Sequence, residues 1–374
     1  MSPTSPTLPW HPIPRSPSGE TCKVHLLQAG GLNIPYELTL LPGPNEPNVS
    51  TSLDNNNQKG KHFYAPDYVF LIQHTPTKEQ YVFDLGMRTD LENLPPYLVK
   101  NTLPVFKCDP IAAADIIRKH GTPEQQPEKA KAVIFSHMHF DHVGDGAKAG
   151  FESAELWVGP TCCTYARPGY PVEPNAPVLT ENLPPDGSRK IVELFVSDAL
   201  LERAGDKRVG QVQEAKSKGL YEAVHFRDPG DEGWIGVAAF DRAVDVFGDG
   251  SAYLIDAPGH SAGHQMMLVR VKTGGTDDDH FVLLAGDCYH HPELLQDPRS
   301  MARPPYSKGS MHLIPEVAIE TVYRTRACAQ RDNIWVIGAH DFSVGNEICS
   351  DRKVIEGLVS LDDWKERGWK NRLV

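Results

Sequence analysis

The residues best suited to chemistry lie in one short segment, Ser136-His137-Met138-His139-Phe140-Asp141-His142. His137 and His139 alternate in a segment that we expect to be extended, so their side chains point the same way. A turn after them would bring Asp141 and His142 to a second position nearby. Imidazole and carboxylate ligands suit Zn, Mn or Fe without any cysteine. The segment therefore predicts a metal site; the alternative is a surface histidine cluster that follows a strand.

Four further polar residues stand where an apolar run ends. They are Asp84 after 81–83, His260 after 252–256, Asp287 after 283–286 and His340 after 334–337. Each alone is a weak signal, because an acidic residue at a strand end is often only a cap. Strand ends on one edge of a sheet sandwich, however, converge on a shared cleft. The repetition of this arrangement predicts that these side chains meet the histidine-rich segment.

Composition narrows the class of protein. The chain has 374 residues, of which 40% are hydrophobic, and a formal net charge of -12. An acidic chain is a poor nucleic-acid binder, because neutralising phosphates needs a basic surface; acidity also argues against an anionic membrane surface. The seven cysteines include no CxxC pair, and no apolar run is long enough for a signal peptide or membrane span. We therefore expect free thiols in a reducing compartment, the cytoplasm.

The apolar patterns predict a layered arrangement of strands and helices. Strands are expected at 23–27, 68–72, 81–86, 131–135, 234–237, 244–247, 252–256, 266–272, 280–285 and 334–337. Helices are expected at 111–120, 313–330 and 352–370. Two groups of strands, each with helices, indicate an α/β domain with two sheets inside and helices outside.

The predicted domain organisation has three parts. Residues 1–20 are rich in Pro, Ser and Thr and are expected to be a disordered tail. Residues 21–350 are expected to form the catalytic domain, with an insertion at about 160–235 that covers another part of it. Residues 351–374 are expected to form a C-terminal helix packed on the domain.

The order and spelling of these motifs resemble the metallo-β-lactamase superfamily. Its HxHxDH motif stands here at 137–142, and its other ligand segments match PGHSAGH, AGD and GAHD, so that the resemblance runs from about residue 24 to about 345. It implies an αββα sandwich of two mixed β-sheets flanked by helices, with metals at one edge of the two sheets.

The resemblance also implies the ligands of two divalent metal ions. The first ion would be held by His137, His139 and His260, and the second by Asp141, His142 and His340, with Asp287 as a bridge. His264 would be a supporting residue, and Asp84 would steady a ligand histidine. Zinc is the expected metal, although Mn, Fe and Co fit the same ligand atoms.

Two cations would lower the pKa of a shared water towards about 7 and so provide a nucleophile for a carbonyl or phosphoryl centre. Asp141 or Asp287 would accept or relay the proton. No serine or cysteine nucleophile is then required, and Ser136 is interpreted as a turn residue.

Within the superfamily, the spelling HMHFDHVGD and the segment from Asp84 to Met87 look most like the quorum-quenching lactonases. Members of that branch use a tyrosine shortly after the bridging aspartate to contact the substrate carbonyl. Here Tyr289 is one position closer to Asp287, and His290 stands in its place. Both are predicted substrate contacts; the alternative is that both only pack under the C-terminal helix.

The predicted function is hydrolysis of a lactone or related carboxylic ester of a small, bulky or aromatic metabolite. Aromatic residues of the insertion would line an apolar pocket, or the insertion would be a lid that supports dimer packing. The alternatives are a thioesterase acting on polyketide or acyl-CoA substrates, a lactam hydrolase, and a metal-binding protein without activity. The expected partners are a small-molecule substrate and a second copy of the chain, with no nucleic acid and no membrane.

Overall fold

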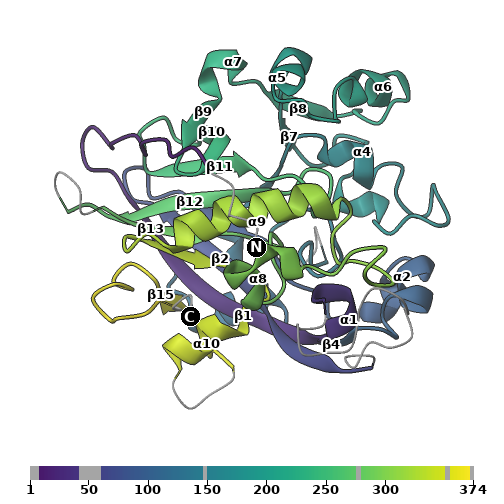
Figure 1. Ribbon diagram of the computed structural model, residues 1–374, viewed down its shortest axis with the longest axis horizontal. Coiled ribbons are helices and arrows are strands. Elements are labelled where there is room, and N and C mark those ends of the chain that lie inside the picture. The colour runs from purple at the N-terminus through teal and green to yellow at the C-terminus, as the bar shows by residue number, and fades with distance from the viewer. Residues whose placement is uncertain (1–7, 42–59, 146–149, 275–278, 350–353, 371–374) are drawn as a thin grey trace, which may run out of the picture.

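Two mixed β-sheets face each other, and helices cover their outer sides (Figure 1). The computed structural model describes residues 8–41, 60–145, 150–274, 279–349 and 354–370. Over these residues the chain forms the αββα sandwich that the sequence predicts, which confirms the fold class.

The first sheet has the strand order β15-β1-β2-β3-β5-β6-β7-β8 in the described residues, with β4 paired to β1. Pairing is antiparallel from β15 to β3 and parallel from β3 to β8. Its strands are β1 (Cys22–Pro35), β2 (His62–His74), β3 (Gln80–Phe83), β4 (Lys107–Pro110), β5 (Ala130–Ile134), β6 (Glu155–Val158), β7 (Ile191–Leu194), β8 (Val224–Arg227) and β15 (Val359–Ser360).

The second sheet has the order β14-β13-β12-β11-β10-β9 over the same described ranges. Its pairing is antiparallel except between β13 and β14. Its strands are β9 (Ile235–Val237), β10 (Phe240–Asp245), β11 (Ala252–Asp256), β12 (Gln265–Lys272), β13 (His280–Leu284) and β14 (Ile334–Ile337).

The longest helix, α9, lies along the outer face of the second sheet and packs against β14 (Figure 1). No helix of the described ranges is both long and apolar enough to span a bilayer. The helices are α1 (Tyr36–Thr39), α2 (Pro96–Asn101), α3 (Ala113–His120), α4 (Cys162–Ala166), α5 (Asp198–Arg203), α6 (Gln211–Ser217), α7 (Gly230–Gly233), α8 (Glu293–Gln296), α9 (Pro315–Ala329) and α10 (Phe342–Ile348), with 3-10 turns η1 (Leu91–Asn93), η2 (Pro127–Lys129), η3 (Thr180–Asn182) and η4 (Pro298–Ser300).

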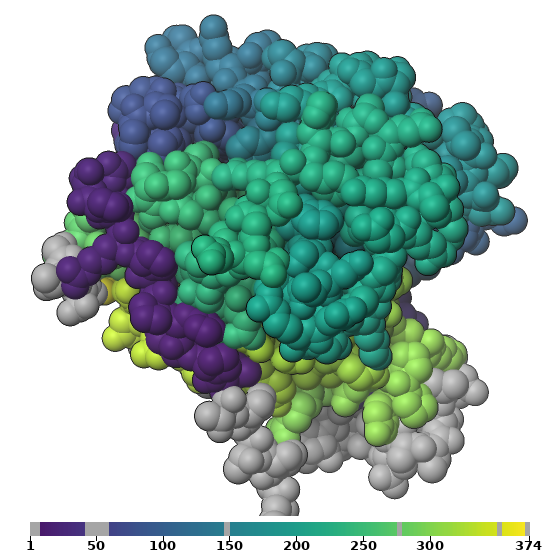
Figure 2. Space-filling model, turned by 90° about the horizontal axis from the view of Figure 1, so that it is seen from above, coloured from purple at the N-terminus to yellow at the C-terminus, as the bar shows by residue number. Residues whose placement is uncertain are grey.

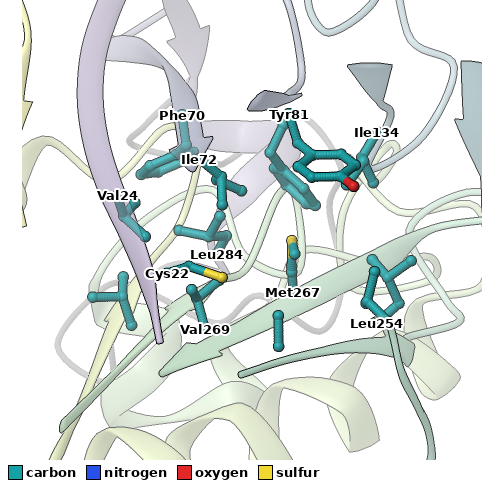
Figure 3. Packing of buried hydrophobic residues seen from close by; sticks show 14 of the residues in the cluster. Cys22, Val24, Phe70, Ile72, Tyr81, Ile134, Leu254, Met267, Val269 and Leu284 are labelled. Atoms are coloured by element: carbon teal, nitrogen blue, oxygen red, sulfur yellow. The ribbon is translucent and has the colours of Figure 1, made fainter. Parts of the chain in front are cut away.

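The core between the sheets is built from apolar side chains of both (Figure 3). Phe70 and Ile134 of the first sheet and Met267 and Leu284 of the second belong to this cluster. Strands β3 and β5 are buried on both faces apart from Lys131, because helices cover their other side. Each fully buried large apolar side chain contributes about 1.5–3 kcal/mol, so the core holds the strand ends in fixed positions.

The strand directions bring the predicted ligand segments to one edge. Strands β3 and β5 are parallel, and so are β13 and β14. Strand β11 runs in the same direction as β13, because both are antiparallel to β12. The carboxyl ends of strands in each group therefore lie on the same side of their sheet. These ends are followed by the segments that carry His137, His260, Asp287 and His340.

Residues 8–20, which the sequence predicts to be disordered, lie against the second sheet. Figure 2 shows the purple N-terminal segment running across the surface beside green atoms of the middle of the chain. The backbone N–H of His11 donates to the carbonyl of Ala238 at 2.7 Å. The carbonyl of Pro14 accepts from Tyr253 Oη at 3.2 Å and from Arg270 Nη2 at 2.5 Å. Proline fixes φ and so reduces the entropy lost on docking. Residues 1–7 lie outside the described residues.

The predicted helix at 352–370 is wrong for the described part, 354–370, which forms β15 and turns. Strand β15 pairs with β1, with Ser360 opposite His25, and the Asp362 carboxylate accepts from the backbone N–H of Val24 at 2.9 Å. Pairing covers the edge of β1, whose polar backbone groups a helix would leave open. Trp364 is buried against Trp335. Residues 351–353 and 371–374 lie outside the described residues.

The segment 160–235, predicted as a covering insertion, partly extends the core. Strands β7 and β8 continue the parallel run of the first sheet beyond β6, and α4 to α7 surround them (Figure 1). These strands have four residues each and stand among prolines and charged residues. Runs this short give no alternation long enough to indicate a strand.

A buried ion-pair network ties this segment to the second sheet. Arg208 makes two bonds to Asp256 at the end of β11, Nη1 to Oδ1 at 3.0 Å and Nη2 to Oδ2 at 2.7 Å. Arg242 Nε donates to the same carboxylate at 2.8 Å. Burial opposes the charge of Asp256, but Arg208 and Arg242 hold its pKa at about 2, below the ordinary 3.8.

We predict that Asp256→Ala destabilises the fold by about 3–5 kcal/mol, because two arginines lose their buried partner. Denaturant unfolding of the metal-loaded protein at pH 7 measures this. The matched control is Asp363→Ala, which breaks an exposed pair with Arg367 and should cost about 1 kcal/mol or less. Because the pKa of Asp256 is lowered in the folded state, its ion pairs contribute fully to the free energy of unfolding above about pH 4. This contribution is lost as pH falls towards 2. Equal effects of the two variants would contradict the prediction.

Candidate metal centre

The histidine-rich segment follows β5 as a loop that is fixed by the neighbouring strands. The backbone N–H of Ser136 donates to Asp84 Oδ1 at 2.6 Å, and the Ser136 carbonyl accepts from the N–H of Gln265 at 2.8 Å. The carbonyl of His142 accepts from the N–H of Leu85 at 2.8 Å. The loop is thus bound to the end of β3 on one side and to the start of β12 on the other.

Two glycines of the ligand segments cannot carry a side chain. Gly286, before Asp287, has φ +48°, and a Cβ there would lie 2.8 Å from Cβ of Ser136. Gly259, before His260, has φ +124°, and a Cβ there would lie 2.3 Å from the backbone nitrogen of Ala318. These close approaches explain why glycine precedes the ligand at both positions.

Four of the predicted ligands form what we call the first ligand group: His137, His139, His260 and Asp287. His137 Nε2 lies 2.9 Å from His139 Nδ1, and His260 Nε2 lies 3.0 Å from each of these two atoms. Asp287 Oδ2 is 3.4 Å from His260 Nε2 and 3.8 Å from His137 Nε2. Three imidazole nitrogens and one carboxylate oxygen therefore face a single point, as a metal ion requires.

The second ligand group consists of Asp141, His142, His340 and, again, Asp287. Asp287 Oδ1 lies 3.2 Å from His142 Nε2 and 3.3 Å from His340 Nε2. Asp141 Oδ2 lies 3.4 Å from His340 Nε2. Asp287 thus turns one oxygen to each group. The structure brings together all seven residues predicted as ligands.

The polar atoms at the centre of these groups fit a metal. His142 Nε2, His340 Nε2 and Asp287 Oδ1 are buried and face one another at ion-pair distance, but no hydrogen bond in the protein satisfies them. Leaving a buried polar atom unsatisfied costs about 1–3 kcal/mol. A cation bound between them would satisfy all three atoms at once.

The electrostatics divide the histidines into two kinds. Burial lowers the pKa of His137 and His260 well below the ordinary value, and that of His139 to about 4, so the first ligand group offers neutral imidazoles. Burial also acts on His142 and His340, but Asp287 and neighbouring carboxylates raise the pKa of both well above 6.5. In the absence of metal, the second group is therefore a cluster of ion pairs.

Two of the ligand histidines, His142 and His340, are oriented by contacts to the ring nitrogen that faces away from the ligand group. His142 Nδ1 lies 2.9 Å from Asp84 Oδ2, and His340 Nδ1 lies 2.8 Å from the carbonyl of Pro66. His264 Nδ1 lies 2.8 Å from the carbonyl of Ala257, and its Nε2 accepts from the backbone N–H of Asp287 at 3.1 Å. Asp84 and His264 thus occupy supporting positions, where the sequence places them.

We predict that Asp84→Asn weakens metal binding in the second ligand group by about 10–100-fold. The asparagine oxygen would accept from Ser136, so its NH₂ would face His142 Nδ1 and force the ring proton onto Nε2, the atom that must bind the metal. Asparagine also tolerates the φ of +61° found at this position. Titration against a competing chelator measures the affinity, with the surface variant Asp109→Asn as control. Unchanged affinity would show that the Asp84 contact is dispensable.

Tyr289 and His290 have different surroundings. Tyr289 is fully buried, and its hydroxyl donates to Asp341 Oδ2 at 2.8 Å and accepts from the N–H of Gly338 at 3.0 Å. The prediction that Tyr289 contacts substrate is therefore wrong. His290 Nε2 lies 3.1 Å from Asp287 Oδ2, beside the ligand groups, and its role stays a prediction.

Sequence reasoning missed His312. This residue forms a third group of possible metal ligands with His260 and His290. Its ring centroid is 5.2 Å from that of His260 and 5.0 Å from that of His290. His312 lies on an irregular segment before α9 and follows no strand, so no pattern marked it.

The segment 160–235 reaches the ligand groups through Tyr165 of α4, whose ring centroid lies 5.8 Å from that of His139. Buried Glu193 fixes the start of α4 by accepting from the backbone N–H of Thr161 at 3.0 Å and of Cys163 at 2.9 Å. Trp234, another aromatic residue of this segment, packs in the core between the sheets and not beside the ligand groups.

The αββα sandwich with clustered histidines and aspartates at one sheet edge defines the class as a metal-dependent hydrolase, and the comparisons agree. The chain is 28% identical over 335 residues to "Metallo-hydrolase mfmC" of Annulohypoxylon moriforme, covering 81% of this chain and 75% of that protein. It is 32% identical over 353 residues to "Gamma-lactamase FDB1" of Fusarium pseudograminearum, covering 82% and 72%. The chain belongs to the metallo-β-lactamase superfamily, close to the lactonase branch.

Two further comparisons cover different shares of the matched proteins. The chain is 29% identical over 324 residues to "Cytochrome P450 monooxygenase mpaDE" of Penicillium roqueforti; the match covers 82% of this chain but spans about a third, 32%, of that relative's length. A solved N-acyl homoserine lactone hydrolase, with the product N-hexanoyl-L-homoserine bound at its catalytic metal centre, superposes with a TM-score of 0.53 at 15% identity over 91% of this chain and 99% of that one. This likeness shows the fold. No family model matches the chain.

Proposed function

We propose that the chain binds two divalent cations, one in each ligand group, and hydrolyses a lactone or a related carboxylic ester. The observation that carries this proposal is the division of the Asp287 carboxylate, with Oδ2 towards His260 and Oδ1 towards His142 and His340. A carboxylate shared in this way would hold two cations close together. Zinc is the proposed metal, because nitrogen-rich sites with carboxylates suit it.

When bound, the cations would supply a water of lowered pKa and a Lewis acid for the substrate carbonyl. The burial of the chain's own residues limits the direction from which substrate can approach. His137, His260 and Asp287 are almost completely buried, whereas His139 is partly exposed and Asp141 is 7% exposed. Substrate therefore approaches from the side of His139 and Asp141. Asp141 is the carboxylate nearest this side and is the proposed proton acceptor.

Ser136 and three buried cysteines are poor candidates for a side-chain nucleophile. Ser136 is fully buried, and its Oγ lies 3.0 Å from His137 Nδ1. Cys162, Cys163 and Cys288 are also buried, and burial raises the pKa of their thiols. A thiol kept protonated is a poor nucleophile. These observations favour attack by water over formation of a covalent intermediate on the protein.

A γ-lactam is the second candidate substrate. "Gamma-lactamase FDB1" is 32% identical to this chain, and a lactam differs from a lactone only in the leaving atom. Both are cyclic acyl compounds whose carbonyl carbon is attacked in the same way. Ester and lactone hydrolysis is the easier reaction, because an alkoxide is a better leaving group than an amide nitrogen.

A substrate panel tests the proposal. The metal-reconstituted protein would be assayed with γ-butyrolactone, an aryl-substituted γ-lactone, 2-pyrrolidinone, an aryl ester and an acyl-CoA thioester. We expect kcat/KM to be largest for the bulky lactone, and metal analysis should give two ions per chain. Turnover of the thioester alone would overturn the lactonase proposal in favour of a thioesterase, and turnover of the lactam alone would favour the second candidate.

Localisation and partners are also proposals. Seven free cysteines suit a reducing compartment such as the cytoplasm. The net charge of -12 supports a small-molecule substrate rather than nucleic acid or an anionic membrane surface. A homodimer is proposed as well; light scattering coupled to size-exclusion chromatography would test it.

A further inference from the structure

Four buried ring nitrogens beside the first ligand group have no partner in the protein. They are His260 Nδ1, His290 Nδ1 and both nitrogens of His312. The three rings lie close together, with centroids 5.0–5.2 Å apart. His312 is only 5% exposed. Each unsatisfied buried polar group costs about 1–3 kcal/mol. This arrangement therefore destabilises the fold unless another molecule makes hydrogen bonds to these nitrogens.

The position of His312 is fixed by the ligand segment itself. The backbone N–H of Leu313 donates to the carbonyl of His260, and that of Ile314 donates to the carbonyl of Gly259, both at 2.9 Å. On the other side, the N–H of Met311 donates to the carbonyl of Leu38 at 3.0 Å. His312 is therefore held on a rigid backbone next to a predicted metal ligand, as a preorganised binding group must be.

His312 also lies close to the surface from which substrate can enter. Leu313, the next residue, is 64% exposed. Met311, the preceding residue, packs in the apolar cluster that contains Phe140, the neighbour of His139. The segment 311–313 thus borders the exposed side of the ligand groups with one buried imidazole turned inward.

We infer that His312, together with His290, forms a polar subsite that hydrogen-bonds a heteroatom of the substrate's acyl or leaving group during hydrolysis. This inference rests on the proposed function. Both ring nitrogens of His312 are buried without a partner in the protein, and a neutral imidazole offers one donor and one acceptor. His290 uses Nε2 towards Asp287 Oδ2, which leaves Nδ1 for the same ligand.

A third metal ion is the competing occupant of this subsite, but the ligand arrangement disfavours it. His260 Nε2 already faces the first ligand group, so His260 could reach another ion only through Nδ1, after loss of its remaining ring proton. Without His260, only two imidazoles remain, fewer ligands than the usual zinc site provides. A polar group of an organic substrate needs only the hydrogen bonds.

The test compares His312→Phe with His312→Gln in the zinc-loaded full-length protein. Phenylalanine fills the space without hydrogen bonds, whereas glutamine restores a donor and an acceptor. We expect kcat/KM for the substrate turned over in the panel to fall about 10²–10³-fold in His312→Phe and to recover at least about tenfold in His312→Gln. His291→Phe is the matched control, because its ring packs on Tyr36, Phe63 and Phe342; it should change kcat/KM less than about threefold.

A binding measurement separates this inference from the proposed function. Phenylphosphonate, a tetrahedral mimic of an attacked acyl centre, would be titrated calorimetrically into the same zinc-loaded proteins. We expect binding to the wild type, at least about tenfold weaker binding to His312→Phe, and recovery in His312→Gln, whether or not lactones are turned over. Equal binding to all variants, or none to the wild type, overturns the subsite. So does a third metal equivalent that is lost in His312→Phe, or fewer than two equivalents in that variant.

Discussion

Replacement of Asp287 by alanine is expected to reduce bound metal to less than one ion per chain and kcat/KM by at least about 10³-fold, or about 4 kcal/mol of transition-state stabilisation. Asp287 is the residue shared by both ligand groups. Without it, His142 Nε2 and His340 Nε2 lose the oxygen that lies 3.2 and 3.3 Å away. Two cations would then repel each other without a shared carboxylate, because the remaining one, Asp141, belongs to the second ligand group alone.

Asp287→Asn sharpens this prediction, because it keeps the shape and removes the charge. We expect it to retain the fold and lose at least one ion, whereas the surface variant Asp332→Asn should keep both ions and full activity. Plasma mass spectrometry of dialysed protein gives the metal content, and steady-state kinetics give the activity. If Asp287→Asn kept two ions and kcat/KM within tenfold of the wild type, the two-cation proposal would fail.

The sequence could predict that these side chains meet because each ligand segment follows a recognisable strand, and the family resemblance supplied their division into two ligand groups. An apolar strand is visible as a run, and its direction in the sheet fixes the edge at which it ends. His137, His260, Asp287 and His340 come from distant segments, yet they meet because β5, β11, β13 and β14 end on one side of the sandwich. The backbone thus does most of the positioning.

The errors arise where position depends on tertiary contacts. Tyr289 follows Asp287 by two residues, but the turn after β13 directs its hydroxyl to Asp341 in the core. His312 has no strand before it, and its position comes from bonds to the carbonyls of Gly259 and His260. In the same way, β15 forms by pairing with the edge of β1. The helical spacing of apolar residues at 352–370 does not reveal such a long-range pairing.

Removal of the metal is expected to abolish activity and to lower the thermal stability of the protein, and both should return when zinc is added back. A ligand at 1,000 times its Kd contributes about 4 kcal/mol to the free energy of unfolding if it binds only the folded state. Dialysis against dipicolinate followed by calorimetry measures the change. Full activity of a protein shown by mass spectrometry to hold less than a tenth of an ion per chain would contradict this prediction.

The size of this stabilisation should also rise with pH between 5 and 8. In the metal-free protein the pKa values of His142 and His340 are raised. Their contribution to the stability of the metal-free fold is therefore complete below the ordinary 6.5 and is lost as pH rises through the raised values. Asp141 and Asp287 have lowered pKa values, and their contribution, complete above the ordinary 3.8, is lost only as pH falls below it. Metal binding needs both histidines unprotonated, so it competes with protons at low pH and gains as they leave. The difference in Tm between loaded and stripped protein should therefore be larger at pH 8 than at pH 5. A difference that stays constant or shrinks over this range would mean that these two histidines do not bind the metal.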